Sequence, residues 1–430
     1  MRYSQPFGTP APPEGQYPRY INGDPITGTE GSIPPATAFD EDQIEILNVI
    51  ESVRALGLIG APGPPSHGDL TQLWQAINAF FNKQYITTAI TRTVYGAGAD
   101  FTDLIAAFKW VANYIITPTG YVTFMCSPGK WNHTQSIEIN HANIARIAIQ
   151  GAAVNAIPTA AGLSVTGYNS ATDGINQAIY LRSCFQTELH FDGGVSGFVA
   201  VRGGCTFRYL LVTGDLSVAT GPPNMWGDYG IGSGFELYDR IQVNGIAVWG
   251  FGKSGFYLFG SGAVHTDSTF PITSSYCRDG ISAYGGFWNS IYAGVFLTSH
   301  NDCGFFCYGG SYFFGHGSSV KGNDAGNGLG GMTLEAGCQV QIAGSISQNN
   351  GAGVLLAGAC TFVGEQTTYA YNTLGGITIS GTCTAWCDDS AFYGNGGNSV
   401  QSGGCAYCEV LRCSIDGPIA YGYGGVVAGP

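Results

Sequence analysis

Charged residues are scarce in this chain, and basic residues are the scarcest. Only 10% of the 430 residues are Asp, Glu, Lys or Arg, and 16 basic against 29 acidic residues give a formal net charge of −13. Since phosphate binding needs a basic surface, this balance argues against a nucleic-acid partner. No stretch approaches about 18 consecutive apolar residues, and residues 1–20 lack the apolar core of a secretory signal. We therefore expect no membrane insertion, and folding in a cytoplasm.

Cysteine is absent before Cys126, and the cysteines number 13, an odd count. In a reducing compartment an odd count argues against a disulfide framework. Four of them recur every 22 or 23 residues: Cys338, Cys360, Cys383 and Cys405. We expect these to form one column of reduced, inward-facing thiols, because cysteine can serve as a small buried hydrophobe. The alternative is a four-thiolate metal site made of two pairs on successive coils: Cys383, Cys387, Cys405 and Cys408. We prefer the buried column and expect no metal and no cofactor.

Glycine, by contrast, is abundant, with 67 residues, and it marks a repeat. The segment "GAGVLLAGAC" at 351–360 is followed by "GGITISGTC" at 375–383, and both place a short apolar alternation between glycines before a cysteine. The glycine before the alternation recurs every 21 to 27 residues: Gly234, Gly255, Gly280, Gly304, Gly331, Gly353, Gly376 and Gly397. Such a period is typical of a short structural unit stacked on its own copies.

Two apolar columns follow these glycines. One residue after the glycine stand Phe235, Phe256, Ile281, Phe305, Met332, Val354, Ile377 and then Asn398. Three residues after it stand Leu237, Leu258, Ala283, Cys307, Leu334, Leu356, Ile379 and Val400. Apolar residues at i and i+2 indicate a strand with one buried face. We therefore predict a mainly all-β fold, a right-handed, single-stranded parallel β-helix. The sequence frames of a leucine-rich repeat and of a left-handed hexapeptide helix are not found. Residues 178–184 and 198–205 resemble earlier versions of the same strand.

A mixed column that faces outward lies between the two apolar ones, and it includes Tyr257, Phe306 and Leu355. Soluble monomers rarely leave an apolar stripe uncovered, so we expect three parallel shafts to bury it in a homotrimer. A further set of aromatic residues aligns on four successive coils: Tyr238, Phe259, Tyr284 and Tyr308. Such a stack is more typical of a core or an interface than of a sugar-binding surface.

The first hundred residues differ from the repeats. Residues 1–35 are rich in Pro, Gly and Thr and cannot form a core of their own. Helices are predicted over 39–57, over 69–81 with a continuous apolar stripe, and over 101–116, which would cap the first coil. We divide the chain into an N-terminal region of extended arm and short helices (1–90), a helical cap and entry (91–135) and the β-helix shaft (136–430).

The N-terminal sequence resembles a known family. "YINGDPITGTEGSIPP" at 20–35, followed by "DLTQLWQAI" at 69–77, is similar to the virion-attachment region of bacteriophage tail fibres and tailspikes. "DLIAAFKWVANYIITPTGYVTFMCSPGKW" at 103–131 is similar to the entry into their pectate-lyase-like right-handed β-helix. The resemblance implies a tail protein of the virion, assembled in the host cytoplasm as a parallel trimer. It also implies attachment to phage tail or baseplate proteins through the N-terminus, and binding of a bacterial surface polysaccharide by the β-helix.

An insertion over 213–229 interrupts the rhythm of the coils and is the first candidate for ligand contact, because irregular loops on a rigid scaffold often carry function. Within it, Trp226 and Tyr229 could stack on sugar rings, and Asp228 could accept hydrogen bonds from hydroxyl groups. The alternative is that Trp226 packs the loop onto the shaft or a neighbouring subunit.

Two further carbohydrate-binding candidates are carboxylates, Glu236 in the outward column and Asp239. Glycoside hydrolysis needs two carboxylates about 5 to 9.5 Å apart, and these two do not make a convincing pair. A lyase would need a proton acceptor beside cations, and the spacing of Arg240, Lys253 and His265 singles out none of them. The catalytic residues are thus unknown. We prefer a non-enzymatic receptor-binding fibre; a polysaccharide depolymerase tailspike and a secreted β-helix enzyme are the alternatives.

Overall fold

The computed structural model describes residues 84–159, 162, 171–192, 194–215, 232–266, 272–290, 296–299, 303–315, 322–325, 330–344, 346–348, 350–422 and 424–429. The predicted N-terminal arm and the helices over 39–57 and 69–81 lie outside these residues. The chain divides into two units, one of residues 1–85 and 112–115, the other of residues 86–111 and 116–430. β1 (Gln84–Ile86) and β3 (Tyr114–Ile116) pair in a two-stranded sheet of their own.

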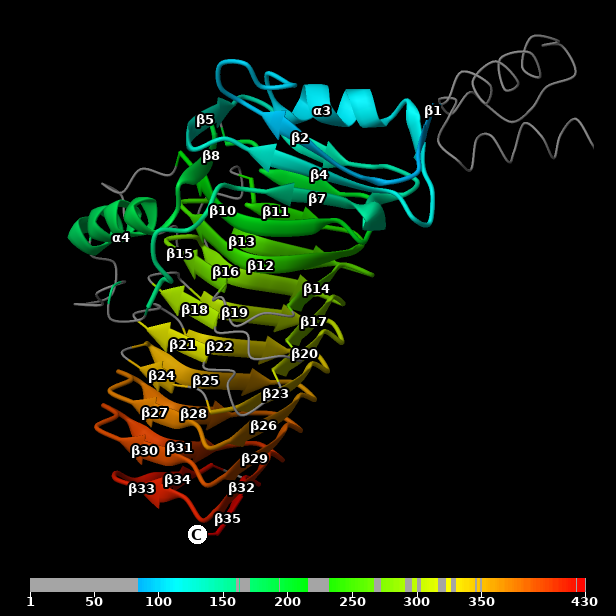
Figure 1. Cartoon of the computed structure of the whole chain (residues 1–430). Coiled ribbons are helices and arrows are strands. Elements are labelled where there is room, and N and C mark those ends of the chain that lie inside the picture. Colours follow the sequence, from blue (N-terminus) through cyan, green and yellow to red (C-terminus); the bar gives the residue numbers. More distant parts are fainter. Residues whose placement is uncertain are drawn as a thin grey trace, which may run out of the picture. The chain divides into compact units, whose positions relative to one another are not determined.

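The second unit is a right-handed parallel β-helix with three faces, in which like strands of successive coils pair in parallel (Figure 1). Face 1 consists of β6 (Ile137–Ile139), β9 (Phe198–Ala200), β11 (Phe235–Leu237), β13 (Ser254–Phe259), β16 (Asp279–Tyr284), β19 (Cys303–Tyr308), β22 (Gly330–Glu335), β25 (Ala352–Ala357), β28 (Gly375–Ile379), β31 (Asn398–Ser402) and β34 (Ile419–Tyr421). Face 2 consists of β2 (Ala89–Val94), β4 (Tyr121–Cys126), β7 (Ile147–Gln150), β10 (Thr206–Gly214), β12 (Arg240–Trp249), β14 (Ala263–Thr266), β17 (Phe287–Ser290), β20 (Tyr312–Gly315), β23 (Gln339–Ala343), β26 (Thr361–Glu365), β29 (Thr384–Asp388), β32 (Tyr407–Leu411) and β35 (Val426–Ala428). Face 3 consists of β5 (Gly129–His133), β8 (Thr187–Phe191), the second halves of β10 and β12, β15 (Ile272–Ser275), β18 (Phe296–Ser299), β21 (Gly322–Ala325), β24 (Ile346–Gln348), β27 (Thr368–Ala370), β30 (Ala391–Tyr393) and β33 (Ser414–Ile415).

β10 and β12 each serve two faces because they bend. Thr206–Arg208 of β10 pairs with β7 on face 2, while Leu211–Gly214 pairs with β8 on face 3. Left-handed backbone lies at the bends, at Tyr209 (φ 56°) and Gly245 (φ 66°). A short 3-10 helix, Ile144–Arg146, leads into β7.

The two predicted apolar columns of face 1 form the interior of the coils, which confirms the β-helix. Phe235 pairs with Phe256, Phe256 with Ile281, and the register continues to Ile377, with these side chains buried. The ring of Phe235 stacks between those of Phe198 and Phe256, with centroids 5.2 Å and 5.0 Å away. Each coil thus stabilises the next by contact between identical or similar apolar side chains.

The register predicted for the last of these coils is wrong: the strand is shifted by two residues. Ile377 pairs with Val400, which places Val400 in the first apolar column. Gly397 and Asn398 therefore precede the repeat position, which Ser399 occupies. Because a serine replaces the glycine here, the glycine pattern alone could not set the register.

The predicted outward apolar stripe is also incorrect in part. Phe306 is only 6% exposed, and its ring packs 5.8 Å from that of Tyr284. Tyr257 and Leu355 are half-buried. A continuous exposed stripe through these residues is absent, so the predicted trimer loses this support.

The helix predicted over 101–116 forms, but it is shorter. α3 spans Leu104–Val111, and the chain enters β3 shortly afterwards, where the β-branched residues at 115 and 116 favour a strand. The ring of Phe108 lies 5.6 Å from that of Phe124 in β4. α3 lies over the first coils and covers that end of the β-helix, as predicted (Figure 1).

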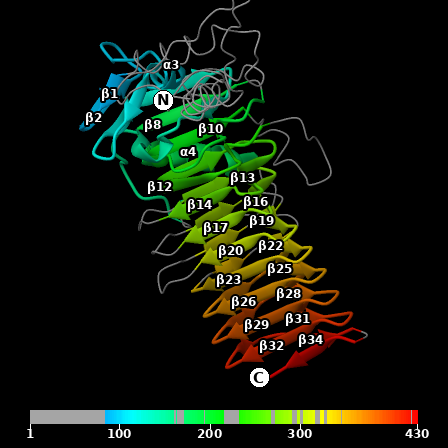
Figure 2. The ribbon, with the colours of Figure 1, turned by 90° about the vertical axis from the view of Figure 1, so that its right-hand side faces the viewer.

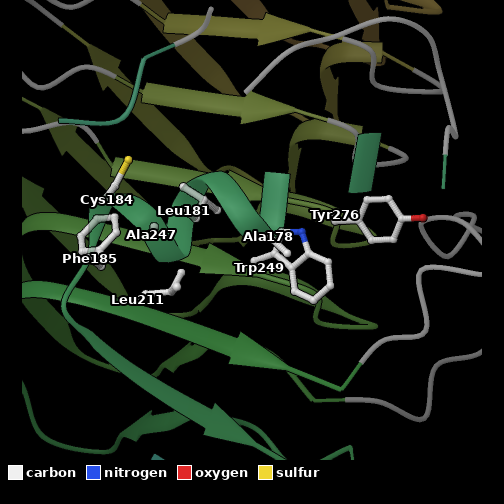
Figure 3. Close-up of a cluster of buried hydrophobic side chains, with 8 residues drawn as sticks. All are labelled: Ala178, Leu181, Cys184, Phe185, Leu211, Ala247, Trp249 and Tyr276. Carbon is white, nitrogen blue, oxygen red and sulfur yellow. The ribbon is translucent and has the colours of Figure 1, made fainter. Parts of the chain in front are cut away.

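Residues 178–184 are a helix and not the strand that we expected. They belong to α4 (Ala171–Cys184), because Ala178, Leu181 and Phe185 recur at i, i+3 and i+7 and form one apolar side. This side docks on outward side chains of face 3 in a buried cluster (Figure 3): Ala178, Leu181, Cys184, Phe185, Leu211, Ala247, Trp249 and Tyr276. The expectation for 198–205 is confirmed, since β9 pairs with β11.

The predicted thiol column is confirmed for three of its four members. Cys338, Cys360 and Cys383 are buried and free, whereas Cys405 is exposed. The pairing of Thr384 with Tyr407 places Ala406, and not Cys405, beside Cys383, so the buried Ala406 continues the column and Cys405 lies one residue outside it.

Among the helices in the described residues, none has the length and apolar character needed to span a membrane.

Candidate functional site

A row of aromatic rings lies where face 1 turns into face 2, and we name it the aromatic ridge: Tyr238, Phe259, Tyr284 and Tyr308. Each residue stands four positions after a repeat glycine. Strand register aligns Phe259 with Tyr284 and Tyr284 with Tyr308. Figure 2 shows the strands of face 1 and face 2 side by side along the shaft.

The turns after these rings explain why they lie at a corner. Left-handed glycines follow three of the rings directly: Gly260 (φ 60°), Gly285 (φ 71°) and Gly309 (φ 67°). Glycine adopts this conformation at little cost, so the chain can turn sharply into face 2. The side chain just before each turn therefore remains on the outer corner.

The rings of the ridge are largely open to solvent. Tyr238, Phe259 and Tyr308 are 43%, 50% and 44% exposed, and Tyr284 is half-buried. Ring centroids are 6.1 Å apart between Tyr238 and Phe259, and 5.9 Å apart between Tyr284 and Tyr308. With coils spaced about 4.8 Å apart, four coils carry the ridge over about 14 Å. The core alternative is therefore excluded, whereas the interface alternative stays a prediction, since an exposed apolar row of this kind marks a contact surface.

A lysine and a glutamate lie beside the ridge on face 1. Lys253 Nζ lies 3.5 Å from the ring centroid of Tyr257, a cation–π contact, and 3.8 Å from Glu236 Oε1. Burial lowers the pKa of Lys253, while the nearby Glu236 carboxylate opposes that shift. Ser196 Oγ also donates a hydrogen bond to Glu236 Oε1 at 2.6 Å. The predicted site residue Glu236 thus flanks the ridge, with its carboxylate already engaged.

Asp239, the other predicted carboxylate, follows Tyr238 at the ridge but stabilises the backbone. Its oxygens accept hydrogen bonds from the backbone N–H groups of Gly203 (2.8 Å) and Arg240 (2.7 Å). It therefore fixes the turn between two coils, and both of its carboxylate oxygens are engaged by backbone N–H groups.

The predicted insertion is described only at its start. Thr213 is a buried residue of β10, so that strand extends into the segment assigned to the insertion. Trp226, Asp228 and Tyr229 lie outside the described residues and stay predictions.

A buried ion pair lies at the start of β16, at the opposite end of that strand from the ridge, and sequence reasoning missed it. Arg278 Nη2 lies 2.8 Å from Asp279 Oδ2, and Ser282 Oγ donates to the same oxygen at 2.6 Å. Burial raises the pKa of Asp279, although the Arg278 charge opposes this. The adjacent Arg-Asp in the sequence was the only available signal. Since both side chains are almost fully buried, we assign them to the structure of the coil and not to ligand contact.

A second polar network ties α4 to face 3. Arg182 donates through Nε and Nη2 to the two oxygens of Glu188, at 2.9 and 3.0 Å. Thr213 Oγ1 donates to Glu188 Oε1 at 2.8 Å and lies 2.8 Å from His190 Nδ1. His190 Nε2 lies 2.9 Å from Asp192 Oδ1. This network links α4 to face 3 through the buried Glu188, whereas the side chains of Arg182 and Asp192 are partly exposed to solvent.

The described residues bring together no group of three or more His, Cys, Asp or Glu side chains that could hold a metal ion. The four cysteines of the alternative thiolate site all fall within the described part of the chain, so the structure does not support that alternative.

Comparison with known proteins gives no match that carries an argument about this chain. No family model matches the chain, and no curated protein matches it. Among solved structures, the A-module of the mannuronan C-5 epimerase AlgE6 from Azotobacter vinelandii is similar at 13% sequence identity, with a TM-score of 0.29. The match covers 72% of this chain and 92% of that one. At this TM-score we draw no functional argument from the likeness.

Proposed function

We propose that this protein binds a polysaccharide along the aromatic ridge. The observation that carries the proposal is the exposure of Tyr238, Phe259 and Tyr308 in register on successive coils. The C–H face of a sugar ring is apolar and packs on an aromatic ring, while tyrosine hydroxyls can exchange hydrogen bonds with sugar hydroxyls. A linear row of rings on an open corner suits a long chain better than a small molecule, which prefers a concave pocket.

We further propose that the protein is a bacteriophage tail fibre or tailspike. Support comes from the resemblance of residues 20–35 and 69–77 to the virion-attachment region of that family. In this proposal the N-terminal region binds tail or baseplate proteins, three chains form a homotrimer, and the β-helix binds a bacterial surface polysaccharide as host receptor. Sedimentation of the full chain tests the assembly: a well-folded monomer at micromolar concentration would contradict the trimer.

The binding proposal is tested with purified capsular polysaccharides and lipopolysaccharides from a panel of bacteria. We expect the full chain to bind at least one of them, and the double variant Phe259→Ala/Tyr308→Ala to bind it at least about tenfold more weakly, a difference of about 1.4 kcal/mol. Tyr371→Ala is the matched control, because Tyr371 is also an exposed aromatic residue (57%) but lies on a later coil, away from the ridge. Equal loss of binding in the ridge variant and the control would contradict the assigned site.

The same incubations test cleavage, by measurement of released reducing ends. Binding without release is the result that a receptor-binding fibre gives. Release of reducing ends would instead establish a depolymerase that uses the same surface.

A further inference from the structure

The part of face 2 that adjoins the aromatic ridge has an unusual charge distribution. None of the strands β10, β12, β14, β17 and β20 contains Asp or Glu, although the whole chain has 29 acidic residues and a net charge of −13. Their outward side chains alternate with buried inward ones such as Phe207, Val243 and Val264. We name the outward set the basic face: Arg208, Arg240, Gln242, Asn244, His265 and Phe287.

The two arginines of the basic face differ from most others in the shaft. Arg92, Arg182, Arg278 and Arg412 each form an ion pair with a carboxylate. Within the described residues, Arg208 and Arg240 form none. Arg240 is exposed, Arg208 is half-buried, and Arg208 Nε is buried without a hydrogen-bond acceptor. The positive charges of these two guanidinium groups are therefore not neutralised by the carboxylates of the described chain.

The neighbours of Arg240 complete a surface suited to a sugar. Tyr238 of the ridge lies two residues before it, and Asp239 between them directs its carboxylate to backbone N–H groups. Register places Gln242 beside His265, and the ring of His265 lies 6.1 Å from that of Phe287. Burial, together with the charge of Arg240, lowers the pKa of His265, so this ring is neutral at pH 7. The side-chain amides and the neutral imidazole of the basic face can hydrogen-bond to sugar hydroxyl groups. The two arginines carry a positive charge and are suited to bind a negatively charged group of the ligand.

We propose that the polysaccharide bound at the aromatic ridge is acidic, and that Arg240 and Arg208 bind carboxylate groups of its sugar residues. This inference rests on the proposed function. A guanidinium group matches a carboxylate with two parallel hydrogen bonds, and it remains charged at every relevant pH. A chain of charge −13 repels a polyanion in general, so an acid-free surface is needed where one binds.

The spacing of the two arginines indicates separate carboxylates. Arg208 pairs with Asn244, four residues along β12 from Arg240. Four residues of a strand span about 13 Å, which exceeds the size of one carboxylate. Arg240, next to the ridge, therefore binds a sugar residue that stacks there, and Arg208 binds a second acidic residue farther across face 2.

The test uses uronic-acid-containing capsular polysaccharides, each beside its carboxyl-reduced product, together with neutral capsules. We expect the chain to bind an acidic polysaccharide, and to bind the reduced product at least tenfold more weakly. Arg240→Gln should weaken binding of the acidic form about tenfold and so reduce the preference for the acidic form over the reduced form, and Arg208→Gln should have a smaller effect of the same kind. Arg412→Gln is the control, since Arg412 is exposed but ion-paired with Asp388 and Asp389. Thermal unfolding of each variant confirms that it is folded.

The two proposals fail in different ways. Equal binding of acidic and reduced forms, or binding of neutral capsules alone, would overturn the acidic ligand. It would leave polysaccharide binding at the ridge intact, provided that Phe259→Ala/Tyr308→Ala still weakens that binding at least about tenfold. Binding of no polysaccharide in the panel would overturn both. Unchanged binding of the acidic form by the double variant Arg208→Gln/Arg240→Gln would remove these residues from the site.

Discussion

Replacement of Phe235 by alanine tests whether stacked side chains inside the coils hold the β-helix together. Phe235 has no exposed surface; its ring stacks on those of Phe198 and Phe256 and meets the ring of Phe207 edge-on at 5.1 Å. Truncation of a buried phenylalanine to alanine costs about 3 to 5 kcal/mol, through lost burial and the cavity that remains. Since Phe235 also makes three ring–ring contacts, we expect a loss near the upper end, about 4 to 5 kcal/mol.

The control for this variant is Tyr238→Ala, three residues along the same coil. Tyr238 lies on the surface, so its removal should change the free energy of unfolding by less than about 0.5 kcal/mol. Urea unfolding followed by circular dichroism measures both, under conditions where unfolding and refolding curves coincide. A loss below about 1 kcal/mol for Phe235→Ala, or losses of equal size in the two variants, would refute the assignment of stability to the interior stack.

Three further predictions concern single groups elsewhere in the shaft. Maleimide should label Cys405 rapidly in the folded chain and Cys338 only after denaturation. Rapid labelling of both in the folded chain would show that the thiols of the column are accessible to solvent. Burial lowers the pKa of His133 below its ordinary 6.5, so at acidic pH the unfolded chain binds more protons than the folded chain. The contribution of the neutral His133 to the free energy of unfolding should therefore be complete above about pH 6.5 and decrease as the pH falls below it. His133→Asn should flatten this pH dependence in thermal unfolding, and an unchanged slope would exclude His133 as its source. Glu188→Ala should speed hydrogen exchange in α4, because Arg182 then loses its bidentate partner; unchanged exchange would show that the apolar cluster alone fixes α4.

The sequence predicts the shaft well because its information is periodic. A buried column repeats one requirement on every coil, so Phe235, Phe256 and their successors reveal the strand and its inward side together. The prediction fails where the local sequence departs from the period. Ser399 replaces the repeat glycine, and the register inferred from Gly397 is therefore wrong.

The prediction also fails where a residue's environment depends on neighbours that are distant in sequence. Phe306 and Tyr308 are two residues apart and both belong to outward columns, yet Phe306 is buried and Tyr308 is 44% exposed. The difference arises from their positions in the coil, since Tyr308 precedes a left-handed glycine turn at the corner. The helix α4 was missed for a related reason: residues 178–184 fit the strand pattern in isolation, and only their docking on face 3 favours the helix.

The candidate site was predicted only in outline. Alignment of Tyr238, Phe259, Tyr284 and Tyr308 follows from the repeat, but their exposure could not be read from it. Glu236 lies beside the ridge, which agrees with its predicted outward position. The role of its carboxylate depends on contacts with Ser196 and Lys253 on neighbouring coils, which the repeat does not reveal.

Hydroxyl-radical footprinting of the full chain, with and without a bound capsular polysaccharide, tests the central claim most directly. Oxidation of an aromatic side chain reports its accessibility, so bound polysaccharide should protect Tyr238, Phe259 and Tyr308 and leave Tyr371 unchanged. Protection of Tyr371 with unchanged oxidation of the three ridge residues would contradict binding at the aromatic ridge.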